Sequence, residues 1–169
     1  MNGVGGFSPW RNTIYLFLFK TKPVSKWYST IKEVFCHEYA HAYALNFSER
    51  KTLLDDLIFE GLAEHFMEAV LKTKSKLGHV LKKQDVLRFL KALIPKFNSR
   101  NRSLKSAVFF QDKKYPLWAG YSIGYHLVQL YLGQYKRRLI PWKEILKSSP
   151  REIYKQIEQK LKFEVSSIK

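Results

Sequence analysis

His37-Glu38-Tyr39-Ala40-His41 is an HExxH motif, and Glu60 follows it after an interval that spans residues 42–59. Two histidines four positions apart lie on the same face of an α-helix, where both rings can reach one metal ion. The glutamate between them can accept a proton from a water on that ion, and a later glutamate can supply a third ligand. A His₂Glu set that leaves one coordination position open is typical of catalytic, rather than structural, zinc sites.

The apolar residues around this motif predict a helix over residues 26–47. At about 100° per residue, one apolar stripe contains Ile31, Val34, Phe35, Ala42 and Leu45. Glu38 falls near the middle of this stripe, and the two histidines fall on its flank. A carboxylate that faces a core is costly unless an opposite charge compensates it, as a zinc ion would. The alternative is a surface helix with solvated histidines, and the position of Glu38 argues against it.

A second helix is predicted over residues 52–72. One face of it carries Leu53, Leu57, Glu60, Ala63, Glu64, Met67 and Leu71. Two carboxylates therefore interrupt an apolar surface, which makes ordinary solvent-facing charges the weaker interpretation. Gly61, inside this helix, costs about 1 kcal/mol relative to alanine, and close backbone packing beside a metal would explain its presence.

The HEYAH and EGLAE motifs resemble those of the gluzincin metallopeptidases, the broad class that contains thermolysin and the zinc aminopeptidases. Residues 118–125, WAGYSIGY, contain a third motif, GYxxG. The three motifs together are similar to those of a family of small bacterial predicted zinc proteases, over about residues 3–135, although only the motifs themselves are specific. The resemblance implies one Zn²⁺ per chain, with His37, His41 and Glu60 as ligands and Glu38 as the catalytic base.

The resemblance also implies that Glu64 orients a ligand histidine from outside the coordination shell. Thermolysin-like enzymes have aspartate at this place, so the longer side chain leaves open whether Glu60 or Glu64 is the third ligand. The interval after HExxH matches the zinc aminopeptidases, which favours Glu60.

Hydrolysis of a peptide bond also requires a donor to the oxyanion, besides the metal. Tyr121 is the first candidate for this role, with Tyr125 and His126 behind it. All three lie in an apolar, aromatic helix predicted over residues 117–135, where tyrosines are more often core or interface residues. For His126, the sequence favours a hydrogen-bonded packing residue over a catalytic one.

Composition limits the remaining function classes. The net charge is +16, from 30 Lys and Arg against 14 Asp and Glu, and such a charge attracts nucleic acid, anionic membrane or acidic proteins. No nucleic-acid motif is present, and the aromatic residues lie in apolar segments instead of among the basic runs. We therefore interpret the lysines as solvated faces that bias substrate choice toward acidic peptides.

The expected function is zinc-dependent hydrolysis of peptide bonds, with a peptide or protein as substrate. Two alternatives stay open: a zinc hydrolase of a non-peptide bond, and a basic binding protein with an inactive metal site. Glu38 argues against the second alternative, because a structural site needs no general base. The sequence does not distinguish an endopeptidase from an exopeptidase, and it does not indicate an oligomeric state.

The expected fold is a mostly helical α+β domain that spans residues 1–169, with a short strand region beside the zincin-like helix pair. Thr13–Phe19 reads as a β-strand after a glycine-rich loop. Further helices are predicted near residues 83–94, after Pro141, and from a capping box at Ser149-Pro150-Arg151-Glu152. Residues 95–116 read as an irregular flap over the cleft, with a short strand at Leu104–Phe110.

Localisation is expected to be cytoplasmic. The apolar stretch Thr13–Phe19 is too short to span a membrane, and it lacks the preceding basic region of a signal peptide. The chain starts close to this strand, which leaves room for a further segment upstream. The single cysteine, Cys36, cannot form an intramolecular disulfide, so the fold does not depend on oxidation.

Overall fold

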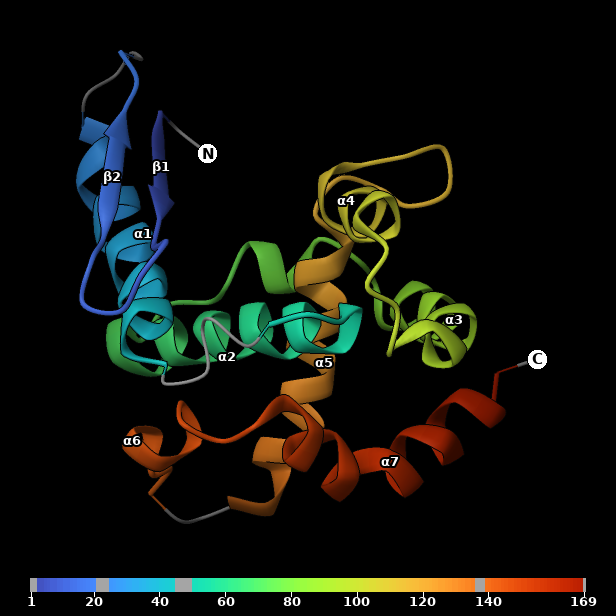
Figure 1. Cartoon of the computed structure of the whole chain (residues 1–169). Coiled ribbons are helices and arrows are strands. Elements are labelled where there is room, and N and C mark those ends of the chain that lie inside the picture. The colour runs from blue at the N-terminus through green and yellow to red at the C-terminus, as the bar shows by residue number, and fades with distance from the viewer. Residues whose placement is uncertain (1–2, 21–24, 45–49, 136–138, 169) are drawn as a thin grey trace.

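The computed structural model describes residues 3–20, 25–44, 50–135 and 139–168. It shows an α+β fold in which a two-stranded antiparallel sheet precedes a set of packed helices (Figure 1). The elements are β1 (Val4–Phe7), β2 (Tyr15–Leu18), α1 (Ser25–Tyr43), α2 (Leu53–Leu71), η2 (Leu77–His79), α3 (Lys83–Leu93), η3 (Ile94–Lys96), α4 (Arg102–Phe110), α5 (Ala119–Leu132), η4 (Gly133–Tyr135), α6 (Trp142–Ile145) and α7 (Pro150–Ser166). The predicted mostly helical α+β class is therefore confirmed.

The sheet is a hairpin in which Val4 pairs with Leu18 and Phe7 pairs with Tyr15. The predicted strand at residues 13–19 is confirmed as β2, but the glycine-rich segment before it was expected to be a loop and instead forms β1. The burial of the Val4 side chain favours a strand over a loop in this segment. Gly6 allows the strand to approach α1 closely, because an added Cβ atom there would collide with Val34 and Glu38.

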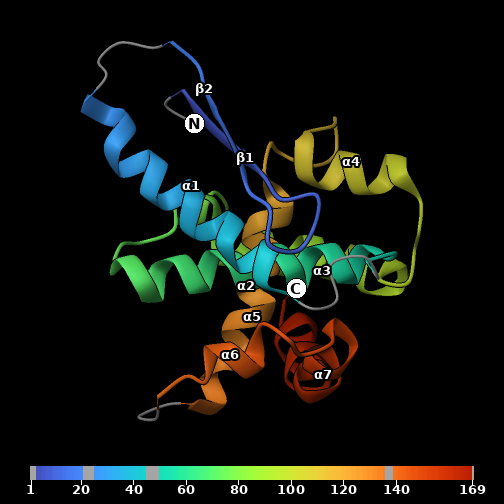
Figure 2. The same cartoon turned by 60° about the vertical axis from the view of Figure 1, so that its left-hand side comes forward.

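Two hydrogen bonds fasten the hairpin to α1. The Ser8 hydroxyl donates to the carbonyl oxygen of Glu38 at 3.0 Å, and the Asn12 N–H donates to the carbonyl oxygen of Ala42 at 3.1 Å. The hairpin consequently lies against the part of α1 that carries the HExxH motif (Figure 2).

Helix α1 covers most of the predicted range and ends at Tyr43. The last part of that range, including Leu45, lies outside the described residues. Phe35 was expected on the apolar stripe, but 48% of it is exposed. The buried apolar residues of this helix are small ones such as Cys36 and Ala40, and Ala40 belongs to the same hydrophobic cluster as Leu62 and Ala63 of α2.

Helix α2 begins after Thr52, whose hydroxyl accepts a hydrogen bond from the Asp55 N–H at 3.3 Å in a capping box. It crosses α5 at two glycines, Gly61 and Gly124. A Cβ atom at Gly61 would lie 2.2 Å from the carbonyl oxygen of Gly124. The close backbone packing expected at Gly61 is therefore found, and its partner is α5.

The segment at residues 95–116 differs most from its prediction. Leu104–Phe110 was expected to be a short strand in an irregular flap, but it forms helix α4. The Asn101 side chain caps this helix by accepting a hydrogen bond from the Leu104 N–H at 3.0 Å. Val108 and Phe109 are buried, so α4 packs as part of the core.

The last helix follows its sequence signal. Ser149 and Glu152 form the predicted capping box at the start of α7, and Pro141 precedes α6. One hydrophobic cluster connects α2, α3, α4, α5 and α7, with Leu57, Leu90, Ile123, Leu127, Ile153 and Leu161 among its fully buried members. Among the described residues, no helix has both the length and the apolar character needed to cross a membrane.

Candidate metal centre

Helices α1 and α2 bring three potential ligand atoms together. The Nε2 atoms of His37 and His41 lie 2.9 Å apart, and the Oε2 atom of Glu60 lies 3.1 Å from the first and 3.2 Å from the second. These three residues form a group that could hold a metal ion. The helical spacing of the two histidines and the packing of α2 across α1 are sufficient to produce this arrangement.

Glu64, one helical turn beyond Glu60, contacts the other side of the first histidine. Its Oε1 atom lies 2.8 Å from Nδ1 of His37. A carboxylate in this position favours a proton on Nδ1, which leaves the Nε2 lone pair directed at the ligand cluster. The hydroxyl of Ser75, in the segment after α2, donates to Oε2 of Glu64, so both oxygens of this buried carboxylate have partners.

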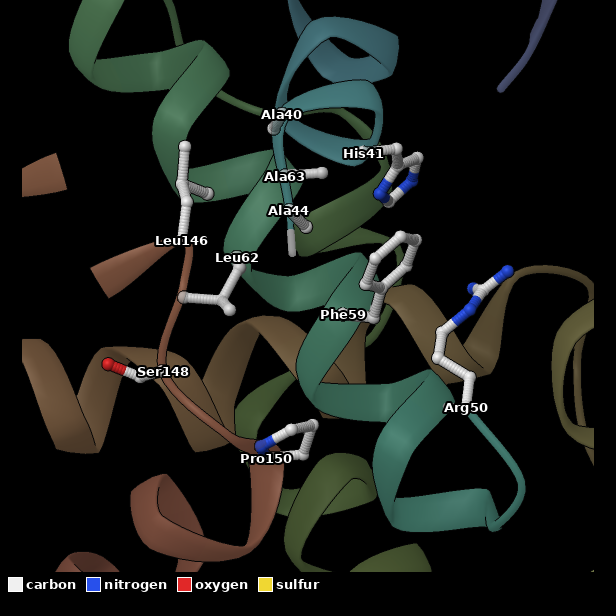
Figure 3. A pocket seen from close by; sticks show the side chains of 10 residues that line it. All are labelled: Ala40, His41, Ala44, Arg50, Phe59, Leu62, Ala63, Leu146, Ser148 and Pro150. Carbon is white, nitrogen blue, oxygen red and sulfur yellow. The ribbon is translucent and has the colours of Figure 1, made fainter. Parts of the chain in front are cut away.

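The second histidine is fixed by aromatic packing. The His41 ring stacks on Phe59 with ring centroids 4.0 Å apart and planes 3° from parallel. The Arg50 guanidinium lies over the same phenyl ring at 3.9 Å from its centroid, and its Nη1 atom lies 3.8 Å from Oε1 of Glu60. The three side chains border a small pocket beside the cluster (Figure 3). Its volume is about 20 Å³.

The charges of the cluster centre on the Glu60 carboxylate. Burial raises the pKa of Glu60, but the nearby histidines outweigh burial and leave that pKa well below its ordinary value. Burial lowers the pKa of His41, which keeps its ring neutral. Burial also lowers the pKa of His37, but hydrogen bonds to Glu60 and Glu64 outweigh it and raise the pKa. An anionic oxygen thus faces two imidazole nitrogens at one point.

The donor set is compatible with a metal ion such as zinc. Ligand bonds of about 2.0–2.2 Å place neighbouring donors of one tetrahedral ion roughly 3.3–3.5 Å apart, and the separations of 2.9, 3.1 and 3.2 Å come close to this range. The model of a family described as "Predicted Zn-dependent protease (DUF2268)" matches residues 1–155. The chain belongs to this family. No curated protein and no solved structure matches the chain.

Glu38, the central glutamate of the motif, lies on the wall of a pocket of about 240 Å³. The pocket is next to the ligand cluster, because His37 and Glu64 also line it. Strand β1 closes one side, where a Cβ atom at Gly6 would lie 2.5 Å from Cγ of Glu38. The chain therefore places the buried Glu38 beside the cluster, at the edge of this cavity.

Tyr121 lines the same pocket from α5. Its ring centroid lies 6.2 Å from that of His37. The negative charge of Glu60, followed by burial and the charge of Glu64, raises the pKa of Tyr121 far above its ordinary value. The phenol consequently stays protonated and is available as a hydrogen-bond donor.

Tyr125 and His126 have other partners. The Tyr125 hydroxyl donates to Oε2 of Glu68 at 2.8 Å, and its ring stacks on His65. The Nε2 atom of His126 lies 2.8 Å from Oε2 of Glu164 in α7. The structure thus brings Tyr121 to the pocket with His37 and Glu38, whereas the described contacts of Tyr125 and His126 are elsewhere.

Three residues at this site had no signal in the sequence that identified them. Gly6 stood in a glycine-rich stretch that reads as a loop, and Ser75 stood in a run of lysines. Arg50 could have been recognised only as one of many basic residues. The contacts of these three residues depend on tertiary structure. Only Ser75 had a weak indication in the sequence, because it follows Glu64 after a short interval.

Proposed function

We propose that this protein is a zinc-dependent peptidase, in which one domain, residues 1–169, hydrolyses peptide bonds. The observation that carries the proposal is the meeting of His37, His41 and Glu60 within 3.2 Å, with Glu38 on the adjoining pocket wall. A His₂Glu set with a further glutamate beside it is the composition of a hydrolytic zinc site. Membership of DUF2268 supports the same proposal.

His37, His41 and Glu60 would hold the ion, and Glu64 would keep His37 in the correct tautomer. Bound zinc would polarise the scissile carbonyl and lower the pKa of water to about 7. Glu38 would then accept the proton of the attacking water and deliver it to the departing amine, since Glu38 lines the pocket beside His37. Tyr121, protonated for the reasons given above, would donate a hydrogen bond to the oxyanion.

The pocket also indicates which substrates fit. Its wall contains the apolar side chains Val34, Met67, Leu77 and Trp118, so an apolar side chain of a peptide can be buried there. Lys76 lies at the same pocket and forms an ion pair with Glu33 at 2.8 Å. The charge of +16 favours approach of acidic peptides over long range, while the pocket itself binds an apolar group.

Metal content tests this proposal directly. Protein purified without added metal is expected to contain about one zinc ion per chain by mass spectrometry, and Glu60→Ala is expected to lose it, because two imidazoles alone leave the site with too few ligands. Retention of zinc by Glu60→Ala would contradict the ligand set. A wild-type protein that stays free of zinc after reconstitution would contradict the proposal as a whole.

Glu64 provides a graded test of the same site. Removal of a carboxylate that orients a ligand histidine weakens metal binding by about 10–100-fold, so Glu64→Ala should bind zinc more weakly by this factor while it still binds one ion. Glu64→Gln should lose less of the affinity for zinc, because its amide oxygen can still accept the hydrogen bond from Nδ1 of His37. Competition titration with a chromogenic chelator measures both affinities. Complete loss of zinc in Glu64→Ala would instead indicate direct coordination by Glu64.

A further inference from the structure

One face of the hairpin is aromatic. Antiparallel pairing places Phe7 opposite Tyr15, and Gly5 opposite Phe17. Since side chains alternate along a strand, the face that contains these pairs also contains Phe19, whose N–H bonds to the Gly3 carbonyl at 2.7 Å. Trp10, in the connection between the strands, packs edge-on against Tyr15. We call Phe7, Trp10, Tyr15, Phe17 and Phe19 the aromatic face.

The aromatic face is open to solvent. The exposed fractions of its residues are 54% for Phe7, 62% for Trp10, 46% for Tyr15, 47% for Phe17 and 62% for Phe19. The hairpin lies at one end of the molecule and α7 lies at the other (Figures 1 and 2). A contiguous apolar surface of this kind is unusual for a protein that has no partner for it.

Strand β2 is apolar on its second face as well. Leu16 and Leu18 pair with Gly6 and Val4 and therefore point to the side of α1, but 38% and 53% of these leucines remain exposed. Lipid chains can cover the aromatic face together with the exposed parts of these leucines at the edge of the hairpin.

Charge complementarity identifies the kind of lipid. Residues 1–32 contain Arg11, Lys20, Lys22, Lys26 and Lys32, and they contain no Asp or Glu. The side chains of Arg11 and Lys20, at two ends of the aromatic face, are exposed. Basic residues around Trp, Tyr and Phe are the combination that binds peripheral proteins to anionic headgroups, with the aromatic rings at the depth of the interface.

We propose that the β1–β2 hairpin docks this protein onto the surface of an anionic lipid bilayer, with the aromatic face inserted among the lipids. The inference goes beyond the proposed peptidase activity and does not depend on it. Because Ser8 and Asn12 fasten the hairpin to α1, docking holds the helix that carries Glu38 near the membrane, where membrane-associated peptides are concentrated.

Sedimentation with vesicles tests the docking of the full chain. Vesicles of equal parts phosphatidylcholine and phosphatidylglycerol are expected to bind the protein, and vesicles of phosphatidylcholine alone are expected to bind it at least about tenfold less well. The double variant Phe17→Ser/Phe19→Ser should lower the affinity for anionic vesicles at least about tenfold, because two inserted rings are lost. Its circular dichroism should match that of the wild type, since both rings are about half exposed.

Matched variants on α7 distinguish vesicle binding through the hairpin from binding through general charge and hydrophobicity. Phe163→Ser removes a ring on α7 that is 76% exposed, and it should change vesicle binding by no more than about twofold. Arg11→Gln/Lys20→Gln should weaken binding about tenfold, whereas Lys155→Gln/Lys160→Gln on α7 should weaken it much less. Absence of binding to anionic vesicles, or equal losses in hairpin and α7 variants, would overturn the proposal. So would a wild-type dimer, found by sedimentation velocity, that Phe17→Ser/Phe19→Ser separates into monomers, because a second copy would then cover the aromatic face.

Discussion

Glu38→Gln is expected to lower the rate of peptide hydrolysis by about 1000-fold and to leave zinc binding unchanged. Glutamine has nearly the same shape as glutamate, but it cannot accept a proton from water near neutral pH. The candidate metal site consists of ligand atoms from His37, His41 and Glu60, and Glu38 contributes none of them. The substitution therefore removes the proposed base without removing a ligand.

Two quantities are measured on the same samples of variant and wild type. Mass spectrometry monitors the turnover of a mixed peptide library, and the zinc content is determined separately. Tyr121→Phe is the companion variant, because it removes one hydroxyl from the same pocket wall and should reduce turnover by about 100-fold. Activity of Glu38→Gln within tenfold of the wild type would exclude Glu38 as the general base. Loss of zinc from Glu38→Gln would show that this carboxylate helps to hold the ion.

The helix pair that carries the site could be predicted because its signals are local. The spacing of His37 and His41 depends only on the period of an α-helix, and the start of α2 is specified by Thr52 and Asp55 in a capping box. The interruption of apolar faces by Glu38 and Glu64 also predicted burial, which the structure confirms at 7% and 3% exposed. These features needed no knowledge of how the helices pack.

The hairpin shows why the rest could not be predicted. Glycines are rare in strands, so the segment that contains Gly5 and Gly6 gives a loop signal in isolation. In the structure, the absence of a side chain at Gly6 is what allows β1 to lie against Glu38. The reason for Gly6 is this close contact with α1, and such a contact follows from the tertiary fold alone.

Helix α4 was missed for a different reason. Val108, Phe109 and Phe110 form a branched and aromatic run that is ambiguous between a strand and a buried helix when read locally. The Asn101 cap and the burial of Val108 and Phe109 decide for the helix. The same dependence on packing explains Gly61, whose neighbour Gly124 lies far away in the sequence and close in space.

The crossing of α2 and α5 at Gly61 and Gly124 predicts the largest effect of a substitution on stability. Gly124→Ala is expected to reduce the free energy of unfolding by about 3 kcal/mol or more and to lower Tm by roughly 10 °C. The added Cβ atom would lie 2.0 Å from the carbonyl oxygen of Leu57 and 3.2 Å from the Gly61 nitrogen. Both are backbone atoms of α2, so no side chain can rotate to make room and the two helices have to separate.

Gly133→Ala is the matched control for this prediction. Gly133 has a helical φ of −57°, and an added Cβ atom would meet only the Lys160 Nζ atom at 3.9 Å. Alanine at such a position restricts the unfolded chain and stabilises a protein by about 0.4–1 kcal/mol. Thermal unfolding followed by circular dichroism should thus show a lower Tm for Gly124→Ala, and a higher Tm for Gly133→Ala, than for the wild type. Equal Tm values for Gly124→Ala and the wild type would mean that α2 and α5 are farther apart than the structure indicates, and the position of Glu60 relative to α1 would then need revision.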